Sequence, residues 1–148
     1  MAQEFGTEIE KLLYETLIGD GVLATLLGGD GVDPRIYLSW RAESRPRISD
    51  SLQGYVVIRF DSAEEPSALS ETVDDRRERY LLSIFSLPEA REFRGEVMMR
   101  FRELFHRKSF VTESFLVYDV GEIAGEEHMM DNRLMELRYI LSCGFLPR

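Results

Sequence analysis

The chain has 148 residues, of which 44% are hydrophobic and 30% are charged, and its formal net charge is −9. This is the balance of a soluble globular protein, and the length predicts a single domain spanning residues 1–148. Apolar runs are only a few residues long, so no membrane-spanning segment is expected, and the single cysteine excludes an internal disulfide framework.

The negative charge lies in the first half of the chain. Residues 1–75 carry 15 acidic and 6 basic side chains, whereas residues 76–148 carry 12 of each. An acidic protein does not attract nucleic acid through its overall field, because DNA is itself an anion. Two explanations stay open at this point: simple solubility, or a surface past which DNA must slide without being held.

Two short helices are predicted at the start of the chain. The sequence TEIE forms a capping box, in which the Thr7 hydroxyl accepts a hydrogen bond from the Glu10 amide. An apolar stripe at helical spacing follows, and Gly19 suits the end of this first helix. Asp20 can cap the second helix, after which residues 32–40 read as an extended segment.

The rest of the chain predicts four strands and one long helix. Stretches rich in β-branched and aromatic residues mark strands at 55–60, 78–85, 114–120 and 134–141. Apolar residues from Phe93 to Phe105 recur at helical spacing, and SLPE before them reads as a second capping box with Ser86 as the cap. The predicted fold is α+β: a mainly antiparallel four-stranded sheet, with the N-terminal helix and one long central helix packed on one face.

Residues 61–76 read as a long flexible loop between the first two strands. The segment contains one proline and few large apolar groups, so burial cannot offset the entropy of ordering it. Its carboxylates are Asp61, Glu64, Glu65, Glu71, Asp74 and Asp75.

A second acidic stretch raises the question of a metal site. Glu126, Glu127, His128 and Asp131 lie within six residues. The spacings of the EF-hand and of the H-E-x-x-H metal site are absent, however. We therefore read residues 121–133 as a hairpin loop between the last two strands and expect no metal and no cofactor. The alternative is a stand-alone α+β small-molecule-binding or metal-binding enzyme domain that uses the 126–131 loop.

No residue pattern indicates an enzyme. Cys143 sits in an apolar stretch typical of a strand end, and a catalytic cysteine needs a polar, activating setting. His106 is expected at the boundary of the long helix. The Gly-rich stretch near residue 28 lacks the Lys-Ser/Thr pair of a phosphate-binding loop and does not follow a strand.

Taken in order, the predicted elements resemble the tail-completion or tail-terminator proteins of long-tailed phages and prophages, the group that includes the minor tail protein U of phage lambda. The likeness covers nearly the whole chain. It rests on LLGGDGVDPRIYLSW, GYVVIRF, RRERYLLSIFSLPEAREFRGEVMMRFRELF and MMDNRLMELRYIL, which follow one another in this order.

The resemblance implies a structural protein of the virion tail or neck, made in the bacterial host cytoplasm. Six copies would form a homohexameric ring that caps the tail tube, contacts the head–tail connector proteins and lets DNA pass without specific binding. A neighbouring neck protein is the alternative, because such proteins share this type of fold. The candidate interface or channel-lining residues are Glu64, Glu65, Glu71, Asp74, Asp75, Arg76, Arg77, Glu126, Glu127 and Asp131.

Overall fold

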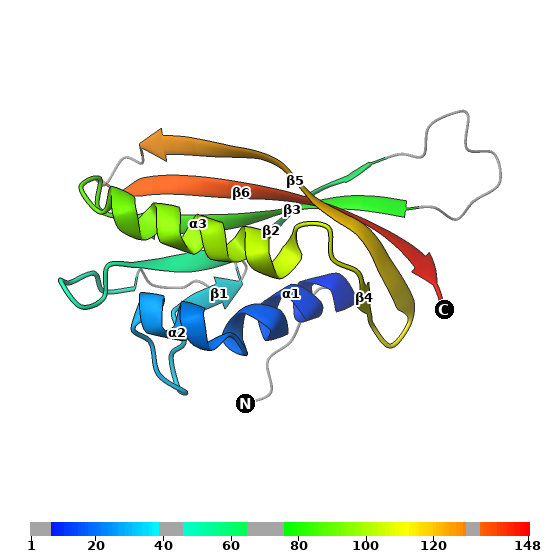
Figure 1. Cartoon of the computed structure of the whole chain (residues 1–148), viewed down its shortest axis with the longest axis horizontal. Helices are drawn as coiled ribbons and strands as arrows, with labels where there is room; N and C mark the ends of the chain where they lie inside the picture. The colour runs from blue at the N-terminus through cyan, green and yellow to red at the C-terminus, as the bar shows by residue number, and fades with distance from the viewer. Residues whose placement is uncertain (1–6, 39–45, 65–75, 130–133) are drawn as a thin grey trace.

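The computed structural model describes residues 7–38, 46–64, 76–129 and 134–148. Within these ranges the chain forms three helices and one six-stranded sheet (Figure 1). The helices are α1 (Glu8–Ile18), α2 (Gly21–Leu27) and α3 (Arg91–Phe105). The strands are β1 (Ile36–Leu38), β2 (Gly54–Glu64), β3 (Arg76–Ser86), β4 (Phe110–Val111), β5 (Phe115–Met129) and β6 (Met135–Pro147). None of the described helices is both long enough and apolar enough to cross a membrane.

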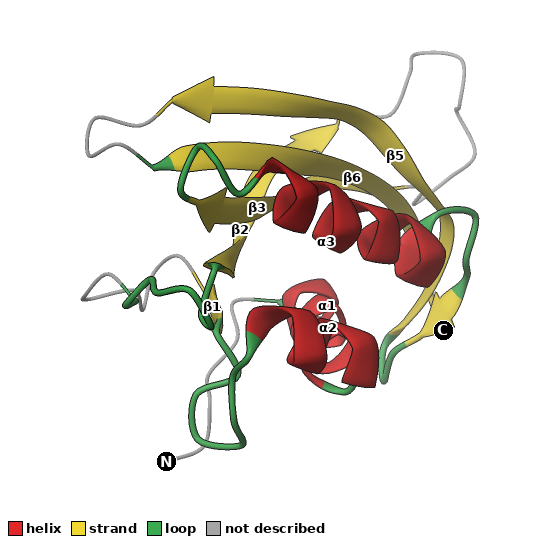
Figure 2. Ribbon diagram, turned by 60° about the vertical axis from the view of Figure 1, so that its left-hand side comes forward, coloured by secondary structure: helices red, strands yellow, loops and turns green. Residues whose placement is uncertain are grey.

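The predicted fold class is wrong. The sheet has the order β1-β2-β3-β6-β5-β4 and is mixed, because β1 runs parallel to β2 while the other neighbours are antiparallel. It curls around α3 as a half-barrel rather than forming a four-stranded antiparallel layer behind one long helix (Figure 2). β1 lies within the extended segment predicted over 32–40, but it was not counted as a strand of the sheet, and β4 was not predicted. With only three and two residues, these strands are too short for alternation to be recognised.

Both N-terminal helices begin where the sequence predicted. The Glu10 amide donates to the Thr7 hydroxyl oxygen over 3.0 Å, and the Leu23 amide donates to an Asp20 carboxylate oxygen over 3.0 Å. Gly28 follows α2 with φ of 71°, in the left-handed region that glycine adopts without a steric penalty. Local capping chemistry therefore defines this part of the fold.

Helix α3 begins later than predicted, and Ser86 is not its cap. The residue before α3 is Ala90, which makes no side-chain capping bond. Ser86 is instead the last residue of β3, where it pairs with Gly54 and Met135. Sheet pairing on both sides of β3 holds Ser86 in the strand, and a turn separates it from α3.

The core lies between the helices and the inner side of the sheet. On α3, Phe93 is 4% exposed while Val97 and Phe101 are fully buried, so the predicted phase of this helix is confirmed. The Phe101 and Tyr139 rings lie with their centroids 5.7 Å apart. Other buried apolar residues of the helices and central strands include Ile9, Leu13, Leu17, Leu23, Leu27, Val56, Ile58, Tyr80, Leu82, Ile84, Phe105 and Leu141. Burial of this apolar surface is the main stabilising term for the fold.

Candidate functional site

The acidic stretch of the last hairpin is a strand over most of its length. Residues 121–129 belong to β5, and Gly125 to Met129 pair with Tyr139 to Met135 of β6. The prediction of a hairpin loop over 121–133 is therefore wrong for residues 121–129, whereas Asp131 lies outside the described residues. Pairing with the apolar strand β6 overrides the low strand propensity of glycine and glutamate.

Strand geometry changes what these acidic residues can do. A strand sends successive side chains to opposite faces, so adjacent residues do not converge on one point. Glu126 and His128 occupy register positions opposite Arg138 and Glu136, while the Glu127 carboxylate lies 3.7 Å from Nε of Arg94 in α3. In the parts of the chain that the structure describes, no three His, Cys, Asp or Glu residues gather where they could hold a metal.

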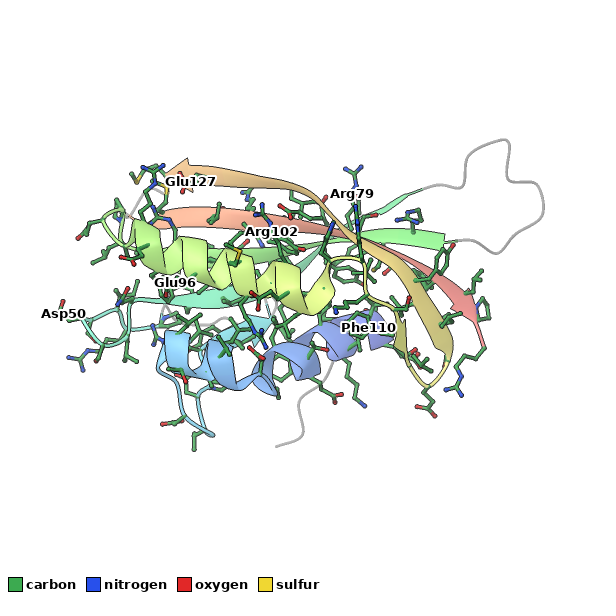
Figure 3. All side chains as sticks on the ribbon, in the orientation of Figure 1. Asp50, Arg79, Glu96, Arg102, Phe110 and Glu127 are labelled. Atoms are coloured by element: carbon green, nitrogen blue, oxygen red, sulfur yellow. The ribbon has the colours of Figure 1, made fainter. Side chains whose placement is uncertain are left out.

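Two acidic residues of β5, Glu122 and Glu127, connect the strand to α3. Both Glu122 carboxylate oxygens accept hydrogen bonds from Arg102, over 2.6 and 2.7 Å. This pairing raises the pKa of the Arg102 guanidinium. Figure 3 labels Arg102 and Glu127 on their two elements. With the Arg94–Glu127 contact, the pair ties the helix to the strand at two points, which is a structural use of carboxylates.

The predicted loop over 61–76 is shorter than expected, because its ends are strand. Residues Ser62 to Glu64 pair with Arg79 to Arg77 beyond an irregularity after Phe60, and Arg76 pairs with Phe145. Among the candidate residues, Glu64, Arg76 and Arg77 are therefore in β2 or β3. The Arg77 guanidinium donates to the Ser142 hydroxyl over 3.3 Å. The candidates Glu65, Glu71, Asp74 and Asp75 lie outside the described residues.

Cys143 and His106 lie where the sequence placed them. Cys143 is 1% exposed within β6, and its thiol donates to the backbone oxygen of Glu78 over 3.8 Å. His106 follows the last residue of α3 and is exposed.

Sequence reasoning missed an ionic cluster on the face of the sheet opposite the helical core. Glu136 of β6 is fully buried, and its carboxylate accepts hydrogen bonds from Arg59 over 2.5 Å and from Arg138 over 3.0 Å. The same Arg59 nitrogen donates to the Ser83 hydroxyl over 2.9 Å. Both arginine side chains stay about one third exposed. The cluster thus places one net positive charge on this face, which we call the arginine face (Arg59, Ser83, Glu136, Arg138).

A sequence signal for part of this cluster existed. Glu136 and Arg138 are two residues apart in a strand, and residues at that spacing share one face. Arg59, however, is 77 residues away from Glu136 along the chain, and only the pairing of β2, β3 and β6 brings it close.

A second ionic group joins α2 to α3. The Arg100 guanidinium donates to both oxygens of Asp20, over 2.9 and 2.5 Å, and to Glu103 over 2.6 Å. These bonds from Arg100 are the main reason why the pKa of Asp20 is lowered. The capping carboxylate of α2 is therefore held by α3 as well. Glu96 lies four residues before Arg100, at a spacing that favours a helical ion pair, but Arg100 instead binds Asp20 and Glu103.

No family model matches the chain, and no curated protein matches it. Among solved structures, it is similar to a chain from the virion of a native gene transfer agent particle, with a TM-score of 0.64 and 11% sequence identity. The alignment covers 90% of each of the two chains. At this identity the likeness shows a shared fold.

Proposed function

We propose that the chain is a structural virion protein, and that it forms the ring that caps a tail tube and joins it to the head. The observation that carries this proposal is the fold shared with a gene transfer agent virion component over 90% of both chains. The order of sequence elements, which resembles phage tail-terminator proteins, supports the same role independently.

An open strand edge supports the proposed self-association. On one side β5 pairs with β6 as far as Met129, but on the other side β4 pairs only with Leu116 and Val117. Among the described residues, no strand covers this edge of β5 from 121 to 129. An uncovered strand edge offers unpaired backbone groups to another chain. The candidate interface residues Glu126 and Glu127 lie on this edge.

The charge of the chain supports a ring through which DNA passes. A net charge of −9 repels a polyanion, so a channel lined by such subunits does not hold DNA. We propose no catalytic activity. In support, Glu122 and Glu127 of β5 contact arginines of α3. In addition, the segment that an enzyme or metal site would use is part of strand β5 as far as Met129.

The oligomeric state and tube length test this role together. Native mass spectrometry and electron microscopy of the purified chain, alone and with the tail tube protein of the same particle, should show rings and tubes of limited length. A hexamer is expected from the tail-terminator resemblance. A chain that stays monomeric at all concentrations and leaves tube growth unchanged would contradict the proposal.

A variant addresses the segment between β2 and β3. Replacing residues 65–75 by a short Asn-Gly turn keeps both strands and removes four of the candidate acidic residues, Glu65, Glu71, Asp74 and Asp75. We expect the variant to fold with an unchanged circular dichroism spectrum but to lose ring formation or tube capping. If it assembles and caps as the natural chain does, the segment is only a spacer.

A further inference from the structure

An apolar groove runs between α2 and α3, on the side of α3 that faces away from the sheet. Its volume is about 590 Å³, and its uncharged lining residues are Val22 and Leu26 of α2 and Gly95 and Met99 of α3. The two residues from each helix lie four positions apart, so they share one face of that helix. Such a surface fits the apolar face of a third helix.

Two apolar side chains of this groove, those of Val22 and Met99, are exposed although the core does not require them, whereas Leu26 is partly buried against the core. Val22 is 49% exposed and Met99 is 57% exposed, whereas Leu23 and Leu27 already anchor α2 in the core. A polar residue at either position would leave the core of this chain unchanged. Adjacent exposed apolar groups in a concave surface typically mark an interaction site.

Gly95 of α3 also indicates that the groove is an interaction site. It lies in the interior of α3, where glycine is less favourable than any residue except proline. A Cβ atom at this position would meet no atom of the described chain within 4 Å outside its own helix, so internal packing does not require glycine. Glycine does permit the close approach of another backbone.

The rim of the groove is acidic. Glu92, Glu96 and Glu103 line it, and Glu96 is labelled in Figure 3. Arg100 also lines it, but its guanidinium already binds Asp20 and Glu103. Glu92 and Glu96 make no ion pair with any described residue. The rim therefore favours a partner with basic flanks, and a second copy of this chain, with a net charge of −9, fits it less well.

We propose that the groove between α2 and α3 docks an apolar helical segment, flanked by lysine or arginine, of a second protein of the virion. The naming of a virion protein rests on the proposed function, whereas the groove and the chemistry of its occupant do not. Apolar contacts with Val22 and Met99 would supply affinity. Glu92 and Glu96 would select basic flanks.

The full chain can be titrated with two labelled peptides, each as long as α3, which has 15 residues. Both peptides carry the same leucine stripe at helical spacing, but one has lysine and the other glutamate on its flanks. Fluorescence anisotropy should show one lysine peptide bound per chain and binding of the glutamate peptide at least about tenfold weaker. Added salt should weaken the binding of the lysine peptide.

Two matched variants assign the binding to the groove. Gly95→Gln fills the groove and should weaken lysine-peptide binding about tenfold or more, while its melting temperature stays the same or rises. Gly31→Gln, at another exposed glycine with no atom within 4 Å of an added Cβ, should bind as the natural chain does. Glu92→Gln combined with Glu96→Gln should weaken binding of the lysine peptide only.

Equal binding by Gly95→Gln and the natural chain would show that only the general negative charge attracts the peptide, and the proposal would be overturned. It would also be overturned if Gly95→Gln abolished self-association, because the occupant would then be a second copy. Ring formation by the natural chain is measured in parallel. If rings form but no peptide binds, the groove proposal fails while the proposed function stands.

Discussion

The two faces of the central strands are stabilised by different interactions: apolar packing on the inner face and ion pairs on the arginine face. On the inner face, Ile58, Leu82 and Tyr139 are fully buried in the apolar core beneath α3. On the opposite side of the same strands, the arginine face holds the buried Glu136 carboxylate between the guanidinium groups of Arg59 and Arg138. The stability of the inner face depends on the area of apolar surface that is buried. That of the arginine face depends on the geometry of its hydrogen-bonded ion pairs.

This difference has a consequence for what each face contributes. Apolar packing is non-directional and tolerates changes that conserve volume. A buried carboxylate has to be matched by its partners, and a hydrophobic replacement of a whole ion cluster is often neutral or stabilising. We therefore expect the inner face to supply most of the stability. The arginine face should instead help to fix the register of β2, β3 and β6.

Phe101→Ala, on the inner face, should have the largest effect. The side chain is fully buried against Tyr139, and truncation leaves a cavity that its surroundings fill only in part. The free energy of unfolding, measured with urea, should fall by about 3–5 kcal/mol. Arg102→Ala, at the next residue, should cost well under about 1 kcal/mol because its side chain is half exposed. Similar costs for the two variants would show that the helix phase is wrong.

Glu136→Gln, on the arginine face, should come next. It removes the negative charge that the two guanidiniums share, and a cost of about 1–3 kcal/mol is expected, reduced from the fully buried case because both arginines are partly exposed. A double variant that also carries Arg138→Gln should recover part of the loss. Strictly additive losses in this cycle would mean that the two side chains are not coupled.

Asp20→Asn should have a smaller effect than Glu136→Gln, about 1 kcal/mol at neutral pH, because asparagine can still cap α2 but loses the charge and one of the two oxygens that accept from Arg100. The pKa of Asp20 is lowered in the folded chain, so this contribution is present above the unfolded pKa and disappears as pH falls through the folded value. Unfolding curves of the two proteins should therefore converge in acid, below about pH 4. A difference that persists unchanged at lower pH would contradict the assignment.

Local chemistry made the helices predictable, and pairing between distant segments made the sheet less so. The caps at Thr7 and Asp20 act within three residues, and the apolar period of α3 extends over four turns. The extension of β5 to Met129 is imposed by β6, against the propensities of its own glycines and glutamates.

The acidic residues of β5 and the α2–α3 groove were also difficult to predict, because both depend on contacts between distant segments. The acidic residues of β5 were visible in the sequence, but their use as partners for Arg94 and Arg102 depends on how α3 lies over the strand. The α2–α3 groove depends on two helices that are separated by more than sixty residues. Its one local signal is Gly95, a glycine in the middle of an otherwise strong helical pattern.

The position of β6 governs the order in which the sheet can form during synthesis. Although β6 leaves the ribosome after β1 to β5, it lies in the middle of the sheet, between β3 and β5. Until residues 135–147 emerge, β3 has one unpaired edge and β5 has no long partner, and such edges are prone to wrong pairing. Closure of these long-range pairs is intrinsically slow. We therefore expect the nascent chain to gain protease resistance only after β6 has been made.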